Sequence, residues 1–81
     1  MDDPQILHSI SELTNEEHDL LHAGETSGGL DDTQRTRLKE LQVEIDRLWD
    51  LLRQRRARRH AGLDPEGAQE RAAGTVEHYQ Q

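Results

Sequence analysis

A dense run of basic residues is the part of this sequence best suited to binding chemistry. Positions 53–60 hold five arginines and one histidine. Cations at this density can bind the phosphates of a nucleic acid or an acidic protein surface. The net charge of −7 opposes long-range attraction to nucleic acid, so we expect the run to dock an intracellular protein, with a nucleic-acid-associated role as the alternative. The candidate partner-binding residues are Arg55, Arg56, Arg58 and Arg59.

The same run has a structural interpretation, because charge is laid out unevenly along the chain. Residues 1–34 contain nine acidic residues and no Lys or Arg, whereas residues 35–60 contain nine basic residues against four acids. If the two segments pack as antiparallel helices, Arg55 lies opposite Asp3, and the acids of the first helix partly neutralise the run. The other three candidate arginines would then project past the first helix and stay largely exposed.

Two histidines with helical spacing are the candidates for metal binding. His18 and His22 are four residues apart and share one face of a helix, with Glu25 one turn further on. Paired imidazoles and a carboxylate can hold zinc or a similar ion. No fourth ligand is evident, so we expect partly exposed histidines and neither a metal nor a cofactor.

Composition argues against an enzyme. The chain has 81 residues and no cysteine, and it shows neither a glycine-rich phosphate loop nor a nucleophile with an identifiable base. A chain of this length forms one domain with a modest core. Its N-terminus is acidic where a signal peptide would be basic, and no apolar run approaches membrane-spanning length, so we expect a cytoplasmic, non-enzymatic protein away from membranes.

A heptad pattern on both sides of a glycine-rich gap predicts the elements that position these residues. The residues expected to face the partner helix, here called the seam residues, recur at steps of three and four. They are Ile6, Ile10, Leu13, Glu17 and Leu20 before the gap and Leu38, Leu41, Ile45, Leu48 and Leu52 after it. When the chain folds back at the gap, opposed seam positions have numbers that add to 58, which pairs Ile10 with Leu48 and Leu13 with Ile45. The polar Glu17 would fix this register.

The expected fold is all-α, an antiparallel two-helix coiled-coil hairpin over residues 1–62, with helices at about 4–23 and 32–60. Asp3 followed by Pro4 is a helix-start signal, and Gly24 is the expected left-handed cap of the first helix.

The second helix has start and stop signals of its own. Asp31 and Gln34 form a predicted capping box, and Ala61-Gly62 ends the helix. Residues 63–81 are expected to be flexible or loosely docked, since Val76 and Tyr79 are their chief apolar residues.

A hairpin this small has a marginal core, which predicts self-association. Leu7, Leu21 and Trp49 fall on one flank of the seam, and Leu51 falls on the other. Two copies that bury the first flank would form a homodimeric four-helix bundle with Trp49 as an anchor.

One segment also carries a family resemblance. It is the stretch Leu48-Trp49-Asp50-Leu51-Leu52-Arg53-Gln54-Arg55-Arg56-Ala57-Arg58-Arg59, followed by Ala61-Gly62 and Asp64-Pro65. With Glu16-Glu17-His18 and the Val76-Glu77-Tyr79 tail, it resembles a family of short uncharacterised actinobacterial proteins described as a domain of unknown function. The resemblance implies a small intracellular helical protein and no particular activity.

Overall fold

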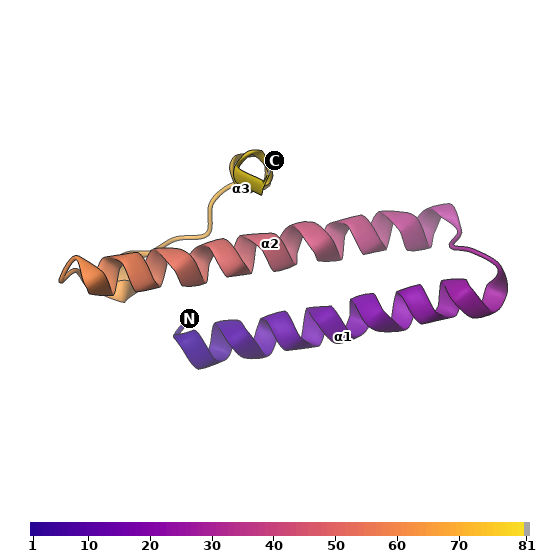
Figure 1. Cartoon of the computed structure of the whole chain (residues 1–81), viewed down its shortest axis with the longest axis horizontal. Coiled ribbons are helices and arrows are strands. Elements are labelled where there is room, and N and C mark those ends of the chain that lie inside the picture. The colour runs from indigo at the N-terminus through magenta and orange to yellow at the C-terminus, as the bar shows by residue number, and fades with distance from the viewer. Residues whose placement is uncertain (81) are drawn as a thin grey trace.

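Two long antiparallel helices and a short C-terminal segment make up the chain, as a computed structural model shows (Figure 1). The structure describes the backbone of residues 1–80 and the side chains of residues 1–77, so the predicted role of Tyr79 lies outside the described side chains. The elements are α1 (Asp3–Ser27), α2 (Asp32–His60), the 3-10 helix η1 (Pro65–Gly67) and α3 (Ala73–Gln80). Every described element is helical, which confirms the predicted all-α hairpin.

The first helix begins with a capping box that the sequence analysis missed. The backbone N–H of Gln5 donates to Oδ1 of Asp2 at 2.9 Å, and the N–H of Asp2 donates to Oε1 of Gln5 at 2.8 Å. The cap is therefore Asp2 and not Asp3. This shift leaves the carboxylate of Asp3 in the first helical turn, free to bind a side chain of the other helix.

The end of α1 also differs from the prediction, because Gly24 lies inside the helix. The helix runs to Ser27, and Gly28, with φ of 83°, is the left-handed cap whose N–H donates to the carbonyl of Gly24. Gly24 is buried, and a Cβ there would lie 2.7 Å from Cδ2 of Leu30. The glycine thus makes room for Leu30 to fold back onto α1, which is a packing requirement and not one of backbone conformation.

The bounds of α2 confirm both of its predicted signals. The N–H of Gln34 donates to Oδ1 of Asp31 at 2.7 Å, and the N–H of Asp31 donates to Oε1 of Gln34 at 2.9 Å. The helix ends at His60, and Gly62 adopts a positive φ of 74°. The N–H of Leu63 then bonds to the carbonyl of Arg58 at 2.8 Å, which turns the chain back along α2.

The core lies at the end of the hairpin where α1 begins and α2 ends. Its buried residues are Ile6, Ile10, Leu48, Leu51 and Leu52, and Leu13, Ile45 and Ala68 pack against them. The predicted register is consistent with this cluster and with the ion pair between Asp3 and Arg55, whose numbers also add to 58. Glu17 is half-buried in the seam. Within residues 1–80, no helix is long and apolar enough to cross a membrane.

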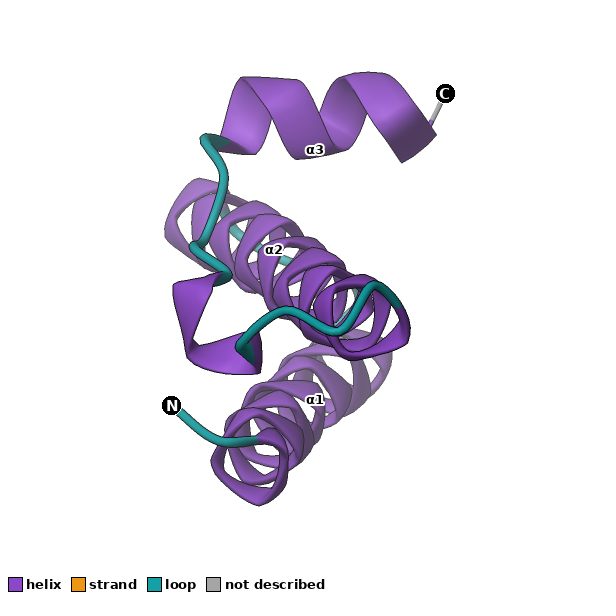
Figure 2. Ribbon diagram, turned by 90° about the vertical axis from the view of Figure 1, so that its left-hand side faces the viewer, coloured by secondary structure: helices purple, strands orange, loops and turns teal. Residues whose placement is uncertain are grey.

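The segment after Gly62 packs along α2 through bonds to its backbone carbonyls. Four side chains of α2 donate to carbonyls of the described part of this segment: Arg58 to Asp64 at 2.6 Å, Arg55 to Pro65 at 3.4 Å, Gln54 to Gln69 at 2.7 Å and Arg47 to Arg71 at 2.9 Å. Figure 2 shows η1 on one side of the α1–α2 layer and α3 running across α2 on the far side from α1. Val76 of α3 is fully buried.

Candidate protein-interaction surfaces

Three large apolar side chains are exposed on one flank of the hairpin. Leu7 is 45% exposed, Leu21 is 44% exposed and Trp49 is 39% exposed. Each follows directly after a seam residue, and in an antiparallel pair these positions of both helices lie on the same side of the seam. We call Leu7, Leu21 and Trp49 the open flank. The structure leaves this predicted self-association surface accessible.

The other flank of the hairpin is covered by the chain itself. Leu51, which the heptad pattern puts on that flank, is only 7% exposed and belongs to the core cluster, against which Ala68 of the tail packs. In Figure 2, η1 and the loops around it lie on one side of the α1–α2 layer, and no described segment covers the opposite side of that layer. One apolar flank is thus closed by the tail, and the open flank is not.

Arg55 is the centre of an ion-pair cluster that joins three parts of the chain. Its Nε donates to Oδ1 of Asp3 in α1, and its Nη1 lies 3.2 Å from Oε1 of Glu66 in η1. Arg59, one turn later, also binds the Asp3 carboxylate. The hydrogen bond from Arg55, aided by the charge of Arg59, holds the pKa of Asp3 below its usual value.

This geometry corrects the assignment of Arg55 as a partner-binding residue. Its side chain is only 7% exposed, because α1 and η1 enclose it on two sides. A guanidinium that is enclosed in this way and already bonded to two carboxylates is not accessible to an external ligand. The structural interpretation of Arg55, opposite Asp3, is the one that the geometry confirms.

The three remaining candidate arginines differ in how far the fold engages them. Arg56 is exposed and forms no ion pair with any residue that the structure describes. Arg58 is half-buried, since its guanidinium lies over Gly67 and bonds to the carbonyl of Asp64. Arg59 reaches back to Asp3, so the expectation that it projects past α1 is wrong. A shallow surface pocket lined by Arg56, Arg59 and His60 marks what stays accessible.

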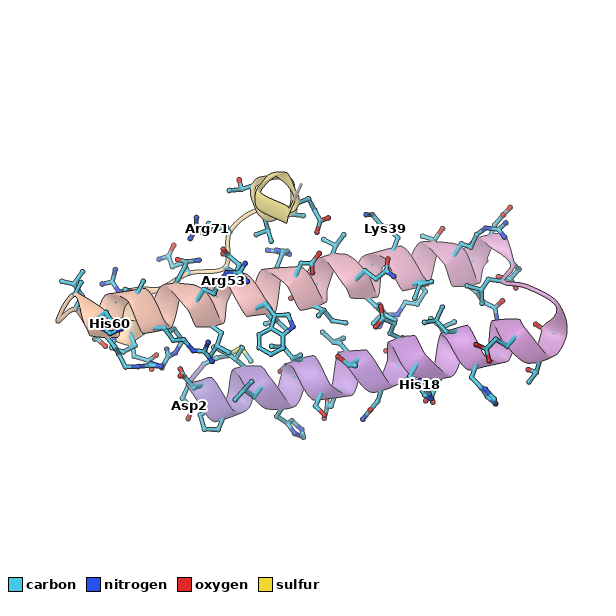
Figure 3. The ribbon with its side chains drawn as sticks, in the orientation of Figure 1. Asp2, His18, Lys39, Arg53, His60 and Arg71 are labelled. Carbon is cyan, nitrogen blue, oxygen red and sulfur yellow. The ribbon has the colours of Figure 1, made fainter. Side chains whose placement is uncertain are left out.

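The histidine pair lies on the surface of α1. His18 and His22 are both exposed, and Figure 3 shows His18 on the outside of the hairpin. Nδ1 of His22 lies 3.8 Å from Oε2 of Glu25. Among residues 1–77, whose side chains are described, no group of three or more histidines and carboxylates could hold a metal ion.

Sequence reasoning missed a set of acidic side chains between α2 and the tail. Glu44 and Glu70 flank Arg47: Oε2 of Glu44 lies 3.2 Å from Nη1 of Arg47, and Oε1 of Glu70 lies 3.7 Å from its Nε. Burial raises the pKa of Glu44, and a hydrogen bond with the Glu70 carboxyl raises it further. One arginine thus holds two carboxyl groups at this contact.

A second pair of acids lies further along the same contact. A hydrogen bond with Asp46 raises the pKa of Glu77, burial adds to the effect, and the charge of Lys39 opposes it. Oε1 of Glu77 is buried and accepts no hydrogen bond from the described residues. No spacing in the sequence could reveal these contacts, because the tail approaches α2 through a turn and not through a helical repeat.

The fold and these surfaces define a small helical-hairpin protein with one open apolar flank and a basic helix end. The chain belongs to the family described as "Protein of unknown function (DUF2630)", which it matches over residues 2–81. It is similar to the "Uncharacterized protein Mb0922c" of Mycobacterium bovis and the "Uncharacterized protein Rv0898c" of Mycobacterium tuberculosis. Each is 41% identical over 78 residues, which cover 95% of this chain and 88% of the relative. No solved structure matches the chain.

Proposed function

We propose that the protein is a non-enzymatic helical interaction module that self-associates through the open flank and docks a second protein through its basic end. The observation that carries the proposal is the position of Leu7, Leu21 and Trp49 on the one flank that the tail leaves uncovered. Several large aromatic and aliphatic side chains exposed along one face are typical of protein contacts, whereas single exposed ones are ordinary.

The tail covers one flank of the hairpin and leaves the other uncovered, and this difference supports a dimer over a monomeric hairpin. The tail closes one flank by packing Ala68 against the core cluster to which Leu51 belongs. A second copy would close the other flank in the same way and bury the indole of Trp49. The result is a four-helix bundle, in which each hairpin contributes two helices.

Sedimentation equilibrium tests self-association directly. At micromolar concentration the wild-type chain should have a mass near twice 9.3 kDa, and Trp49→Ala should shift it toward the monomer. Leu63→Ala is the matched control, because Leu63 is 53% exposed but lies outside the open flank, in the turn after α2. A wild-type chain that stays monomeric would refute self-association.

The basic end supports docking of an acidic protein surface. Arg56 is exposed and unpaired among the described residues, and Arg53 is held only by Asp50, with 3.9 Å between Nη2 and Oδ1. Figure 3 shows Arg53 and His60 on the surface of the C-terminal half of α2. Because Asp3 already neutralises Arg55 and part of Arg59, the charge offered to a long phosphate backbone is small, which favours a protein over a nucleic acid.

The two classes of partner are separated by binding measured at physiological salt. A glutamate-rich peptide should bind the wild-type chain, and the double change Arg53→Gln and Arg56→Gln should abolish binding without altering the fold. Lys39→Gln removes an exposed cation of α2 away from this end and should leave binding unchanged. Binding of random-sequence DNA or RNA that is lost in the double variant would favour the nucleic-acid alternative.

A further inference from the structure

The tail lies on α2 in the way that an extended peptide lies on a receptor. Arg47, Gln54 and Arg58 are spaced by seven and four residues along α2, so their side chains share one face of the helix. We call these three residues the donor row, because each donates to a main-chain carbonyl of the tail. The carbonyls meet the row in reverse order of sequence, so the tail runs back along α2 before it rises to α3 (Figure 1).

The contact between the tail and the donor row depends little on the side chains of the tail. Bonds to main-chain carbonyls hold a peptide whatever its sequence, so the row would accept the backbone of another segment. None of residues 61–75, all of which the structure describes, is buried, and Ala68 is the residue of this stretch that packs against the hairpin core. Further on, α3 buries Val76. Segments held mainly by polar contacts at the surface open more readily than a packed core.

The charged residues of α2 that face the tail do not need it as a partner. Each has a second partner within the hairpin: these pairs are Arg55 with Asp3, Arg47 with Glu44, and Asp50 with Gln54. Asp50 is only 4% exposed, and its Oδ2 accepts from Nε2 of Gln54 at 2.9 Å. No buried charge of these pairs is stranded when the tail leaves, so the donor row remains a formed surface.

The last part of the tail is held against opposing charge. Glu70 of the tail reaches Arg47, which already has Glu44 as a partner. In the same way, Glu77 of α3 meets Asp46 of α2. Each contact brings two carboxyl groups together, and like charges at close range oppose a contact. The tail can therefore leave α2 without dismantling the hairpin.

The tail also shows which chemistry the covered face selects. Oε1 of Glu66 lies 3.2 Å from Nη1 of Arg55, and Glu70, four residues later, reaches the first arginine of the donor row. Gly67 lies under the guanidinium of Arg58, where the Cβ of any other residue would push that group away. The ligand that fits is an extended peptide with two acids four residues apart and a glycine after the first.

We propose that the donor row is a binding site for an extended acidic peptide of another protein, and that the tail is a displaceable strap that occupies this site within the chain. The site is separate from the basic end, because the tail covers the row whereas Arg53 and Arg56 are exposed. The inference therefore stands without the proposed function. Arg55 becomes accessible from the side of η1 when the strap leaves.

The tether decides which partner can use the site. A strap joined to α2 by a short turn competes at high effective concentration, so an external peptide binds only when it is abundant or when the strap is loosened. The tail of a second copy is held by its own donor row in the same way. An acidic segment of a different protein has no such competing site, and it is the occupant that we infer.

A full-length chain with a released strap tests the site. Gly67→Val and Ala68→Asp change the tail alone and leave the donor row unaltered. This released chain should bind a labelled synthetic peptide with the sequence of residues 63–77 about tenfold more tightly than the wild-type chain does in fluorescence anisotropy, because the strap no longer blocks the site. A peptide that carries the same two changes should not bind.

Substitutions in α2 of the released chain locate the bound peptide. Arg58→Gln should abolish binding, and Arg35→Gln is the matched control, because Arg35 is exposed and lies at the other end of α2. The wild-type chain gives a second measurement that does not depend on the released variant. Unlabelled peptide added at millimolar concentration should speed hydrogen exchange at the amide of Val76 and leave that of Leu48, in the hairpin core, unchanged.

Three results would overturn the proposal. Equal affinity of the released and wild-type chains, with no change at Val76, would show that the donor row binds no external peptide. Binding that is lost with Arg53→Gln and Arg56→Gln but kept with Arg58→Gln would assign the peptide to the basic end. A wild-type dimer that survives Trp49→Ala and is lost in the released chain would make the tail of a second copy the occupant.

Discussion

Arg55 of α2 donates a hydrogen bond from Nε to Oδ1 of Asp3, and this contact joins the last third of α2 to the first turn of α1. The same guanidinium holds Glu66 of η1. One side chain therefore fixes the register of the hairpin and the position of the first part of the tail. Because the Arg55 side chain is buried, its charge is compensated only by these carboxylates, and breaking the ion pairs should destabilise the fold.

Replacing Arg55 should loosen three segments together. Arg55→Met keeps the apolar stem and removes both ion pairs, so the urea midpoint should fall and amide protection should drop at both the start of α1 and η1. Arg35→Met is the control, since Arg35 is exposed and its partners, Asp32 and the carbonyl of Leu30, are local, so the midpoint should change little. An unchanged midpoint for Arg55→Met would show that the cluster adds nothing to stability.

Acid should weaken the hairpin through carboxylates whose pKa values the arginines lower. Hydrogen bonds from Arg55 and Arg37 lower the pKa of Asp3 and of Glu16 below their usual 3.8 and 4.5. A lowered pKa in the folded state adds stability that is present above the unfolded-state pKa and is lost as the pH falls through the folded value.

The free energy of unfolding of the hairpin should therefore hold from neutral pH down to about 4.5 and fall below it. Urea titrations followed by far-UV circular dichroism measure this, with Asp3→Asn expected to flatten the acid limb. A hairpin that gains stability in that range would contradict the assigned ion pairs.

The tail should respond to pH in the opposite direction. The pKa values of Glu44 and Glu77 are raised above 4.5, and such groups add stability below the unfolded-state pKa that is lost as the pH rises through the folded value. Glu44 faces Glu70 and Arg47, and Glu77 faces Asp46 and Lys39. Docking of α3 should therefore tighten as the pH falls from neutral toward 4.5.

Hydrogen exchange at the amide of Val76, corrected for its intrinsic pH dependence, reports this docking. Glu77→Gln should raise protection at neutral pH and reduce its dependence on pH, because the amide is neutral and can donate to Asp46. Protection in the wild-type chain that grows as the pH rises from 4.5 to neutral would argue against the two acid pairs.

Replacing two buried aliphatic residues, Leu52 and Val76, should destabilise different parts of the fold. Leu52 is 1% exposed and lies in the core between α1 and α2, so Leu52→Ala should lower the free energy of unfolding by about 3 kcal/mol. Val76 is fully buried as well, but α3 packs on α2 and makes no contact with α1 within the described residues. Val76→Ala should release α3 in hydrogen exchange and leave the cooperative unfolding of the hairpin nearly unchanged.

The hairpin was predictable because its determinants are local or periodic. Seam residues at heptad spacing indicate two helices and their register, and Asp31 with Gln34 marks a helix start that the structure confirms. The capping box formed by Asp2 and Gln5 was missed, because the Asp3-Pro4 pair led to a predicted helix start one residue later. Gly24 was misread because a glycine can serve close packing as well as a left-handed cap.

The position of the tail could not be predicted, because the α2 side chains that hold it bond mainly to backbone carbonyls and not to particular side chains. Arg47, Gln54 and Arg58 donate to backbone carbonyls, which every residue carries. Arg55 was predicted opposite Asp3, but its second partner, Glu66, depends on the turn after Gly62. The exposure of Arg56 and the burial of Arg55 therefore emerge only from the folded chain.

Fluorescence of Trp49 tests self-association through the open flank most directly, because Trp49 is the only tryptophan of the chain and belongs to the proposed contact. Its emission should shift to shorter wavelength as the chain concentration rises, and the shift should saturate as the monomer is consumed. Leu7→Ala should move this transition to higher concentration, and Leu63→Ala should leave it in place. An emission maximum typical of a solvated indole, unchanged across the whole range, would contradict the account.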